Sequence, residues 1–197
     1  SINVQKVVWA AGEVGQPFER IDVGGQFGGN REPAYLAKNP NGQVPTLEDG
    51  EVVIWESNSI VRYLAARYGA GWIWEEDPAR RAEADRWMDW MLSELQPAMT
   101  PAFWGLIRKT PGYTEASVIE ASVTKAEAKL DILEAHLAGR SYLANERFGM
   151  GDITVALGAH RWLHMPVQHK DWPNIRRWYA QVAARPAAGP AMPLPIT

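Results

Sequence analysis

The sequence changes character near residue 70, and this change constrains the fold more than any other feature. Before it, short apolar runs alternate with turn signals, so Phe18–Val23 and Val52–Trp55 are predicted strands, and Asp49-Gly50 predicts a hairpin turn. Helices are predicted at Val4–Val14 and Ser57–Tyr68, the second from its apolar face. This alternation of short strands and helices predicts an α/β layer.

After residue 71 the pattern is helical almost throughout. A long helix is predicted to open at Pro78 and to kink or end at Pro97 and Pro101. Further helices are predicted at Thr114–Leu137, Gly151–Leu163 and Asn174–Ala184. The tail Arg185–Thr197 carries four prolines and is expected to lie over the surface. We therefore predict two domains, an α/β domain over 1–70 and an all-helical domain over 78–197.

Composition excludes several classes of function. Twenty Lys+Arg against 23 Asp+Glu give a net charge of −3, which disfavours a nucleic-acid binder. The longest stretch without a charged side chain, Leu95–Ile107, has 13 residues, whereas a membrane span needs ~20. Cysteine is absent, which removes disulfides, thiolate metal sites and a nucleophilic thiol of the protein's own. With no apolar signal segment at its start, the chain is expected in the cytoplasm.

The segment Asn39–Pro45 is the most unusual stretch of the first 70 residues. Val44-Pro45 is a bond of the only type that becomes cis at low cost. A cis bond there would turn the Val44 backbone outward, leaving its N–H and C=O free to hold an extended peptide-like ligand. The alternative is that Pro45 simply begins an edge strand, and the dipeptide alone favours this alternative.

Glu56-Ser57 stands where a strand ends and a helix begins. Ser57 is a suitable N-cap, and the free N–H groups of the first turn could instead bind a ligand carboxylate. Glu56 could accept from a ligand ammonium group. The pair is therefore suited to the α-amino-acid end of a ligand, although an ordinary cap beside an exposed glutamate would give the same dipeptide.

Taken together, these pieces and the opening heptapeptide Ser1–Val7 resemble the glutathione transferase family over nearly the whole chain. The resemblance implies a thioredoxin-like first domain and a helical-bundle second domain. The opening residues are similar to serine-type members, phi-like or nu-like. Family chains have a strand before the position of Ser1, so we expect the biological chain to extend further upstream.

The resemblance also implies roles for individual residues. Ser1, assisted by Asn3, would hydrogen-bond the sulfur of glutathione and favour its thiolate. The remaining residues implied to hold the tripeptide are Gln43, Val44 and Pro45 along its backbone, Glu56 and Ser57 at its γ-glutamyl end, and Arg31 near its glycyl carboxylate. A pocket for the second substrate is implied at Met99, Phe103 and Trp104.

The function implied is conjugation of glutathione to an electrophile, as in detoxification. A nu-like disulfide-bond reductase that uses bound glutathione is the near alternative, and isomerase or dehalogenase activity stays open. The alternative from another class is a non-catalytic binding protein that keeps the fold. By the same resemblance we expect a homodimer with glutathione as co-substrate, an electrophile or disulfide as partner, and neither nucleic acid nor membrane.

Two features of the helical half complete the predictions. His160 and His164 have the spacing of metal ligands on a helix, but no third ligand is apparent, so no metal is expected. Phe148-Gly149-Met150-Gly151-Asp152 predicts a helix start, with Gly149 at the N-cap position where the family usually has Ser or Thr.

Overall fold

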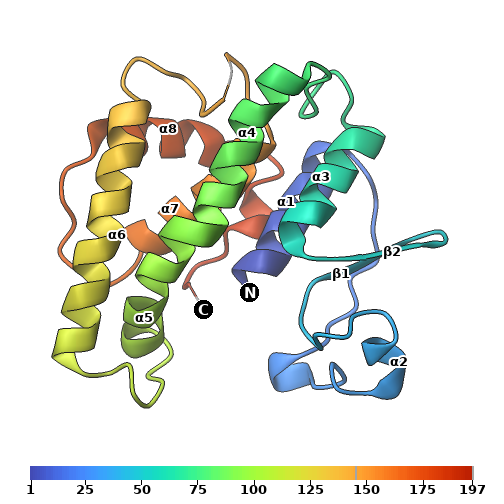
Figure 1. Ribbon diagram of the computed structural model, residues 1–197, viewed down its shortest axis with the longest axis horizontal. Helices are drawn as coiled ribbons and strands as arrows, with labels where there is room; N and C mark the ends of the chain where they lie inside the picture. The colour runs from blue at the N-terminus through green and yellow to red at the C-terminus, as the bar shows by residue number, and fades with distance from the viewer. Residues whose placement is uncertain (145, 197) are drawn as a thin grey trace.

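The computed structural model describes residues 1–144 and 146–196, so Thr197 at the end of the predicted tail lies outside them. Figure 1 shows a unit of two strands and short helices beside a unit of longer helices. The first unit comprises α1 (Ile2–Glu13), α2 (Pro33–Leu36), β1 (Thr46–Asp49), β2 (Val52–Trp55) and α3 (Ser57–Tyr68). The second comprises α4 (Pro78–Trp90), α5 (Gln96–Leu106), α6 (Ala116–His136), α7 (Met150–Leu163) and α8 (Pro173–Ala183). The predicted order, an α/β unit followed by an all-helical unit, is confirmed.

The predicted hairpin is present and is fastened to α3. Strands β1 and β2 pair antiparallel, with Thr46 opposite Trp55 and Asp49 opposite Val52. The hydroxyls of Tyr63 and Tyr68 in α3 donate to Oδ2 of Asp49 at 2.8 and 2.6 Å. These two hydrogen bonds, that of Tyr68 first, lower the pKa of the Asp49 carboxyl. These bonds therefore fasten the turn end of the hairpin to the middle and the end of α3.

The predicted strand Phe18–Val23 is absent, and this prediction was wrong. The segment is irregular, and Phe18 and Ile21 are exposed. A strand needs a neighbour to accept and donate its backbone hydrogen bonds. In the described part of the chain the sheet contains only β1 and β2, which pair with each other.

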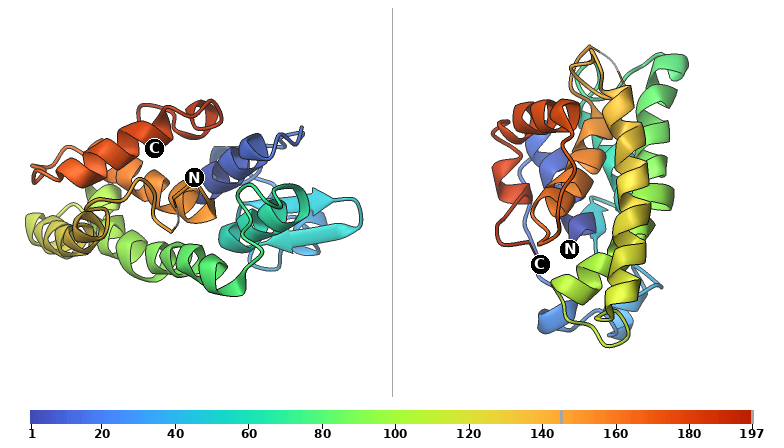
Figure 2. Two further views of the ribbon diagram at one scale, coloured as in Figure 1. Left: turned by 90° about the horizontal axis from the view of Figure 1, so that it is seen from above. Right: turned by 90° about the vertical axis from the view of Figure 1, so that its left-hand side faces the viewer.

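Helix α7 is the centre of the helical unit. Every residue from Met150 to His160 is buried, and the helix packs against α1, α4 and α8 (Figure 2). Its start has the predicted cap, since the Gly149 N–H donates to Oδ2 of Asp152 at 3.0 Å. The other carboxylate oxygen, Oδ1, accepts from Leu143 N at 3.1 Å and from Trp178 Nε1 at 2.8 Å. One buried carboxylate thus joins α7, α8 and the loop before α7.

The two prolines after α4 do not end the helical path. A π-helical turn, Met91–Leu95, leads into α5, where Pro97 lies in the first turn and Pro101 lies inside. Beside Pro101, a side chain of α6 connects two backbone groups of α5. The Ser122 hydroxyl donates to Ala98 O at 2.6 Å and accepts from Ala102 N at 3.0 Å. The backbone groups that an internal proline disturbs are therefore satisfied by a neighbouring helix.

The C-terminal tail, from Arg185 on, is more buried than its prolines predict. Ala188 and Ala191 are buried, and Arg185 forms an ion pair of 2.8 Å with Glu13 at the end of α1. Gly12 of α1 permits this approach, because a Cβ there would lie 2.9 Å from the Cβ of Ala187. The tail therefore packs on α1 in part, while its described residues other than Ala188 and Ala191 are exposed or half-buried.

No helix in the described residues is both long enough and apolar enough to cross a membrane.

Candidate functional site

The starts of α1 and α3 lie together. Both helices run in the same direction in Figure 1, and the Ser57 hydroxyl donates to Asn3 Oδ1 at 3.2 Å. The sequence predicted Ser57 as the N-cap of α3, and this prediction was wrong. The cap is Glu56, and Ser57 is the first helical residue. The serine hydroxyl turns toward α1 because Asn3 offers it an acceptor across the interface.

Neither helix start is capped by its own side chain. Ser1 is exposed at the N-cap position of α1 and makes no side-chain cap hydrogen bond, and the same holds for Glu56 on α3. Free N–H groups and the positive end of the dipole make a helix start attractive to anions. The Asn3–Ser57 contact thus brings two such starts into one place.

Glu56 has an unusual backbone conformation for a residue with a side chain. Its φ and ψ are 73° and 112°, outside the regions that such residues normally occupy. The side chain is exposed beside the buried Ser57. The turn therefore presents a carboxylate at the start of α3, as the sequence predicted.

Side-chain hydrogen bonds hold the segment 39–45, which precedes the hairpin, in place. Asn39, 2% exposed, donates through Nδ2 to Gln43 O at 2.8 Å and accepts from Asn41 N at 3.1 Å. The Tyr35 hydroxyl donates to the same Gln43 carbonyl at 2.6 Å. Both side chains act on the backbone just before Val44, and sequence reasoning assigned a role to neither of them.

The Val44–Pro45 peptide bond is cis, the rarer of the two forms considered from the sequence. Val44 is half-buried, and among the described residues neither its N–H nor its C=O has a hydrogen-bond partner. The Gln43 side chain beside it is exposed. Val44 thus presents one donor and one acceptor, the pair that an added extended peptide requires.

Arg31 lies against this segment. Its Nη1 donates to Asn41 O at 3.4 Å, and the side chain is exposed. Gly42 makes room for it: φ is +59°, and a Cβ there would lie 2.8 Å from both Arg31 Nη1 and Asn30 O. The guanidinium group keeps further donors free at the edge of the site.

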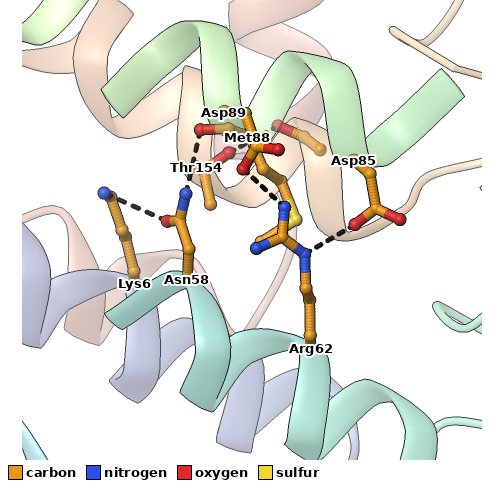
Figure 3. A network of polar contacts seen from close by, with 8 residues as sticks. Lys6, Asn58, Arg62, Asp85, Met88, Asp89 and Thr154 are labelled. Carbon is orange, nitrogen blue, oxygen red and sulfur yellow. Dashed lines mark hydrogen bonds and ion pairs between the residues drawn. The ribbon is translucent and has the colours of Figure 1, made fainter. Parts of the chain in front are cut away.

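Lys6 is the buried charge that sequence reasoning missed. It is fully buried, and its Nζ donates to Asn58 Oδ1 at 3.3 Å, while Asn58 Nδ2 donates to Met88 O at 2.9 Å (Figure 3). Burial, opposed by Glu56 and assisted by Arg161, lowers the pKa of Lys6 to about 8. A signal was available, since Lys6 shares a helical face with the buried Ile2 and Trp9.

A second ionic contact joins α3 to α4 beside this network. Arg62 donates to Asp85 and Asp89 at 2.6 Å each (Figure 3). Together with the Lys6–Asn58–Met88 chain, it fixes the start of α3 against the helical unit. Of the predicted glutathione-binding residues, Glu56 and Ser57 therefore lie at the start of a helix that is held against the helical unit.

The predicted second-substrate residues differ in accessibility. Met99 and Phe103 are each 1% exposed and belong to the core, whereas Trp104 is half-buried and packs edge-on against Tyr113 at 4.8 Å between ring centroids. Of the three, Trp104 alone offers surface to a ligand, and the pocket stays a prediction.

The two histidines of α7 are engaged within the fold. His160 Nδ1 lies 2.8 Å from the Tyr179 hydroxyl, and His164 Nδ1 lies 2.8 Å from the His160 carbonyl oxygen. Within residues 1–144 and 146–196, no group of three His, Asp or Glu side chains is placed to hold a metal ion.

Comparison with known proteins gives matches along the chain. Residues 1–72 match the family model described as glutathione S-transferase, N-terminal domain, and residues 91–186 match glutathione S-transferase, C-terminal domain. Glutathione S-transferase GstB of Escherichia coli K12 is 40% identical over 199 residues, which cover 100% of this chain and 96% of the relative. Glutathione S-transferase 3 of Zea mays is 32% identical, covering 99% and 92%.

Solved structures give the same result. A theta class glutathione S-transferase from Xanthomonas axonopodis pv. citri, with glutathione bound, has a TM-score of 0.94 and 43% identity over 100% of this chain and 95% of that one. The apo form of that enzyme has a TM-score of 0.83 and 38% identity, covering 98% and 92%. The α/β unit with its two strands is thus of the thioredoxin-like type, followed by the helical domain of these proteins.

Proposed function

The chain belongs to the glutathione S-transferase family and is a transferase, and from this premise we propose that it activates the thiol of glutathione for attack on an electrophile. The observation that carries the proposal is the Asn3–Ser57 hydrogen bond of 3.2 Å. It joins two uncapped helix starts, so that one can bind a carboxylate and the other a thiolate.

The γ-glutamyl end of glutathione binds at the start of α3. Its α-carboxylate accepts from the free N–H groups of the first turn and from the Ser57 side, where the helix dipole favours a negative charge. Its ammonium group pairs with Glu56, whose positive φ turns the carboxylate toward the ligand. Gln43 contacts the same end from its exposed position.

The cysteinyl and glycyl parts lie along the segment before the hairpin. The Val44 N–H and C=O pair with the cysteinyl backbone as one rung of an antiparallel ladder, and Pro45 fixes the direction of the segment. The bonds from Asn39 and Tyr35 to Gln43 O hold this rung in place. Arg31 binds the glycyl carboxylate as a charge-assisted hydrogen-bond donor.

Activation of the thiol takes place at the start of α1. A free thiol has a pKa of ~8.5, which a helix N-terminus and nearby cations lower. The Ser1 hydroxyl donates to the sulfur, and Asn3 holds the alignment through Ser57. The thiolate then attacks the electrophilic carbon, and the protein's part is to supply the anion near neutral pH and to orient it.

The thiol pKa of bound glutathione tests this proposal. Thiolate absorbance in the ultraviolet is titrated with wild type, Ser1→Ala and Ser1→Thr. We expect a pKa about two units below the free value in wild type, a rise of at least about one unit in Ser1→Ala, equal to ~1.4 kcal/mol, and partial retention in Ser1→Thr. Calorimetric binding of glutathione with an unperturbed thiol pKa would overturn thiol activation and favour the non-catalytic alternative.

We extend the proposal to a homodimer in the cytoplasm, with glutathione as co-substrate, an electrophile as second substrate and no metal. The support for these points is family membership. Sedimentation equilibrium tests the assembly, with twice the 22.0 kDa chain mass expected.

A further inference from the structure

Two arginines of the helical unit lie over one phenylalanine. The guanidinium carbon of Arg161, on α7, is 4.0 Å from the ring centroid of Phe103, and that of Arg108, just beyond α5, is 5.3 Å from it. Phe103 itself is 1% exposed. The ring therefore forms an apolar floor that holds two cations at one place through cation–π contacts.

Among the described residues, these two cations have no counter-ion. Other half-buried arginines have partners within the chain: Arg62 pairs with Asp85, Arg185 pairs with Glu13, and Arg81 donates to the Glu75 carbonyl oxygen. Among the residues that the structure describes, the guanidinium groups of Arg108 and Arg161 form neither an ion pair nor a hydrogen bond. Burial first, and then the charge of Arg108, lowers the pKa of Arg161 to about 10. Two like charges held together in a partly dry environment favour the binding of an anion.

Arg161 lies on the side of the helical unit that packs against α1, because α7 is one of the main neighbours of that helix. The charge of Arg161 also contributes to the lowered pKa of Lys6, in the second turn of α1. The pair is therefore placed on the side of the helical unit next to the helix whose start is proposed to bind the glutathione sulfur.

We propose that Arg108 and Arg161 form the anion-binding end of the second-substrate site, and that the electrophile carries a carboxylate. This inference rests on the proposed function. A guanidinium group binds a carboxylate through two parallel N–H···O bonds, which orients the substrate as well as binding it. The reacting carbon of the electrophile then lies toward Ser1 and its carboxylate toward Phe103.

The chemical step needs no further reagent. With an aryl chloride as electrophile, the thiolate forms a C–S bond to the ring carbon, and the C–Cl bond breaks with its electron pair leaving on chloride. The thiol proton is released to solvent when the thiolate forms. The arginines take no part in bond making, since they hold the carboxylate at the far side of the ring.

A matched pair of electrophiles tests the inference. The probes are 4-chloro-3-nitrobenzoate and 4-chloro-3-nitrobenzamide, with each kcat/KM divided by the uncatalysed rate constant with glutathione. In wild type we expect the benzoate to be favoured. Arg161→Met and Arg108→Met should each lower the benzoate value at least tenfold and leave the benzamide value within twofold. Arg176→Met, which removes an exposed arginine of α8 paired with Asp171, is the charge-matched control.

Three results would overturn the inference. The first is an equal loss of kcat/KM on both substrates, which would assign the arginines to the thiolate. The second is no loss of kcat/KM on either substrate. The third is a wild type that does not favour the benzoate. Arg108 is exposed, so its variant keeps the test valid if Arg161→Met fails to fold. Calorimetric titration of glutathione runs in parallel: if wild type does not bind glutathione, it is the proposed function that fails.

Discussion

Two sets of polar groups, one in each unit of this protein, differ in where their hydrogen-bond partners lie. In the helical unit, the Asp152 carboxylate accepts three N–H groups, and the Ser122 hydroxyl bridges the backbone beside Pro101. In the α/β unit, the starts of α1 and α3 carry no side-chain cap, and Val44 has no backbone partner in the described chain.

This difference separates groups that hold the fold from groups that bind a ligand. A buried polar group with all its partners stabilises one arrangement of the chain. A donor or acceptor without a partner in the described chain, on a segment that other hydrogen bonds hold in place, is available to a ligand. The helical unit is therefore expected to determine stability, and the α/β unit is expected to determine glutathione affinity.

The largest effect is expected from Asp152→Ala. The substitution leaves three buried or half-buried donors without an acceptor, and the free energy of unfolding should fall by about 3–4 kcal/mol. Urea unfolding measures this loss. Asp171→Ala, at an exposed side chain, is the control with little change. A loss below about 1 kcal/mol would mean that the carboxylate does not hold the helical unit together.

Lys6 is a buried charged group of the α/β unit, with the Asn58 side chain as its partner. Its folded pKa of about 8 lies below the ordinary value of 10.5. Between these values the unfolded chain binds the proton that the folded chain has released, so stability rises with pH. Relative to Lys6→Met, wild type should gain up to about 3 kcal/mol between pH 8 and 10.5. Parallel pH curves from urea unfolding would contradict a buried, titrating lysine.

Ser57→Ala should act on affinity. Removing the hydroxyl breaks the contact with Asn3 and loosens the start of α3, so glutathione binding should weaken about tenfold, or ~1.4 kcal/mol. Ser59→Ala is the matched control, because Ser59 is exposed in the same turn. Isothermal calorimetry measures both. Equal affinities for the two variants would remove Ser57 from the site.

The smallest effect is expected from Tyr35→Phe. It removes the hydroxyl that bonds Gln43 O and Thr46 Oγ1. Only the bond to Gln43 O acts on the Val44 segment, and a single bond of this kind is worth ~1 kcal/mol or less, so glutathione should bind about threefold more weakly. Tyr63→Phe, which loses its bond to Asp49, should cost stability and leave affinity unchanged. If the two variants exchanged these phenotypes, the support assigned to the Val44 segment would be wrong.

The elements that the sequence predicted well are those with local signals. The hairpin has a turn dipeptide, α3 has apolar periodicity, and α7 has a recognisable start at Gly149–Asp152, so these elements were found within one residue. Phe18–Val23 has the composition of a strand, but pairing depends on a neighbour that composition does not reveal. The course of the tail likewise depends on Gly12 and Ala187, whose small size matters only once they meet.

The same distinction applies to the site. Val44, Glu56 and Ser57 were marked by their own dipeptides, whereas Asn39 and Tyr35 act through Gln43 from positions without a signature. The exchange of N-cap roles between Glu56 and Ser57 followed from Asn3, 54 residues away in sequence. Long-range partners of this kind are determined by packing, which one sequence does not display.

A crystal structure of the complex with glutathione tests the central claim most directly. The account predicts the γ-glutamyl carboxylate on the first turn of α3, two hydrogen bonds of about 2.9 Å between Val44 and the cysteinyl backbone, and the sulfur in contact with Ser1. A tripeptide bound elsewhere, with the Val44 backbone and the start of α3 still open, would contradict it.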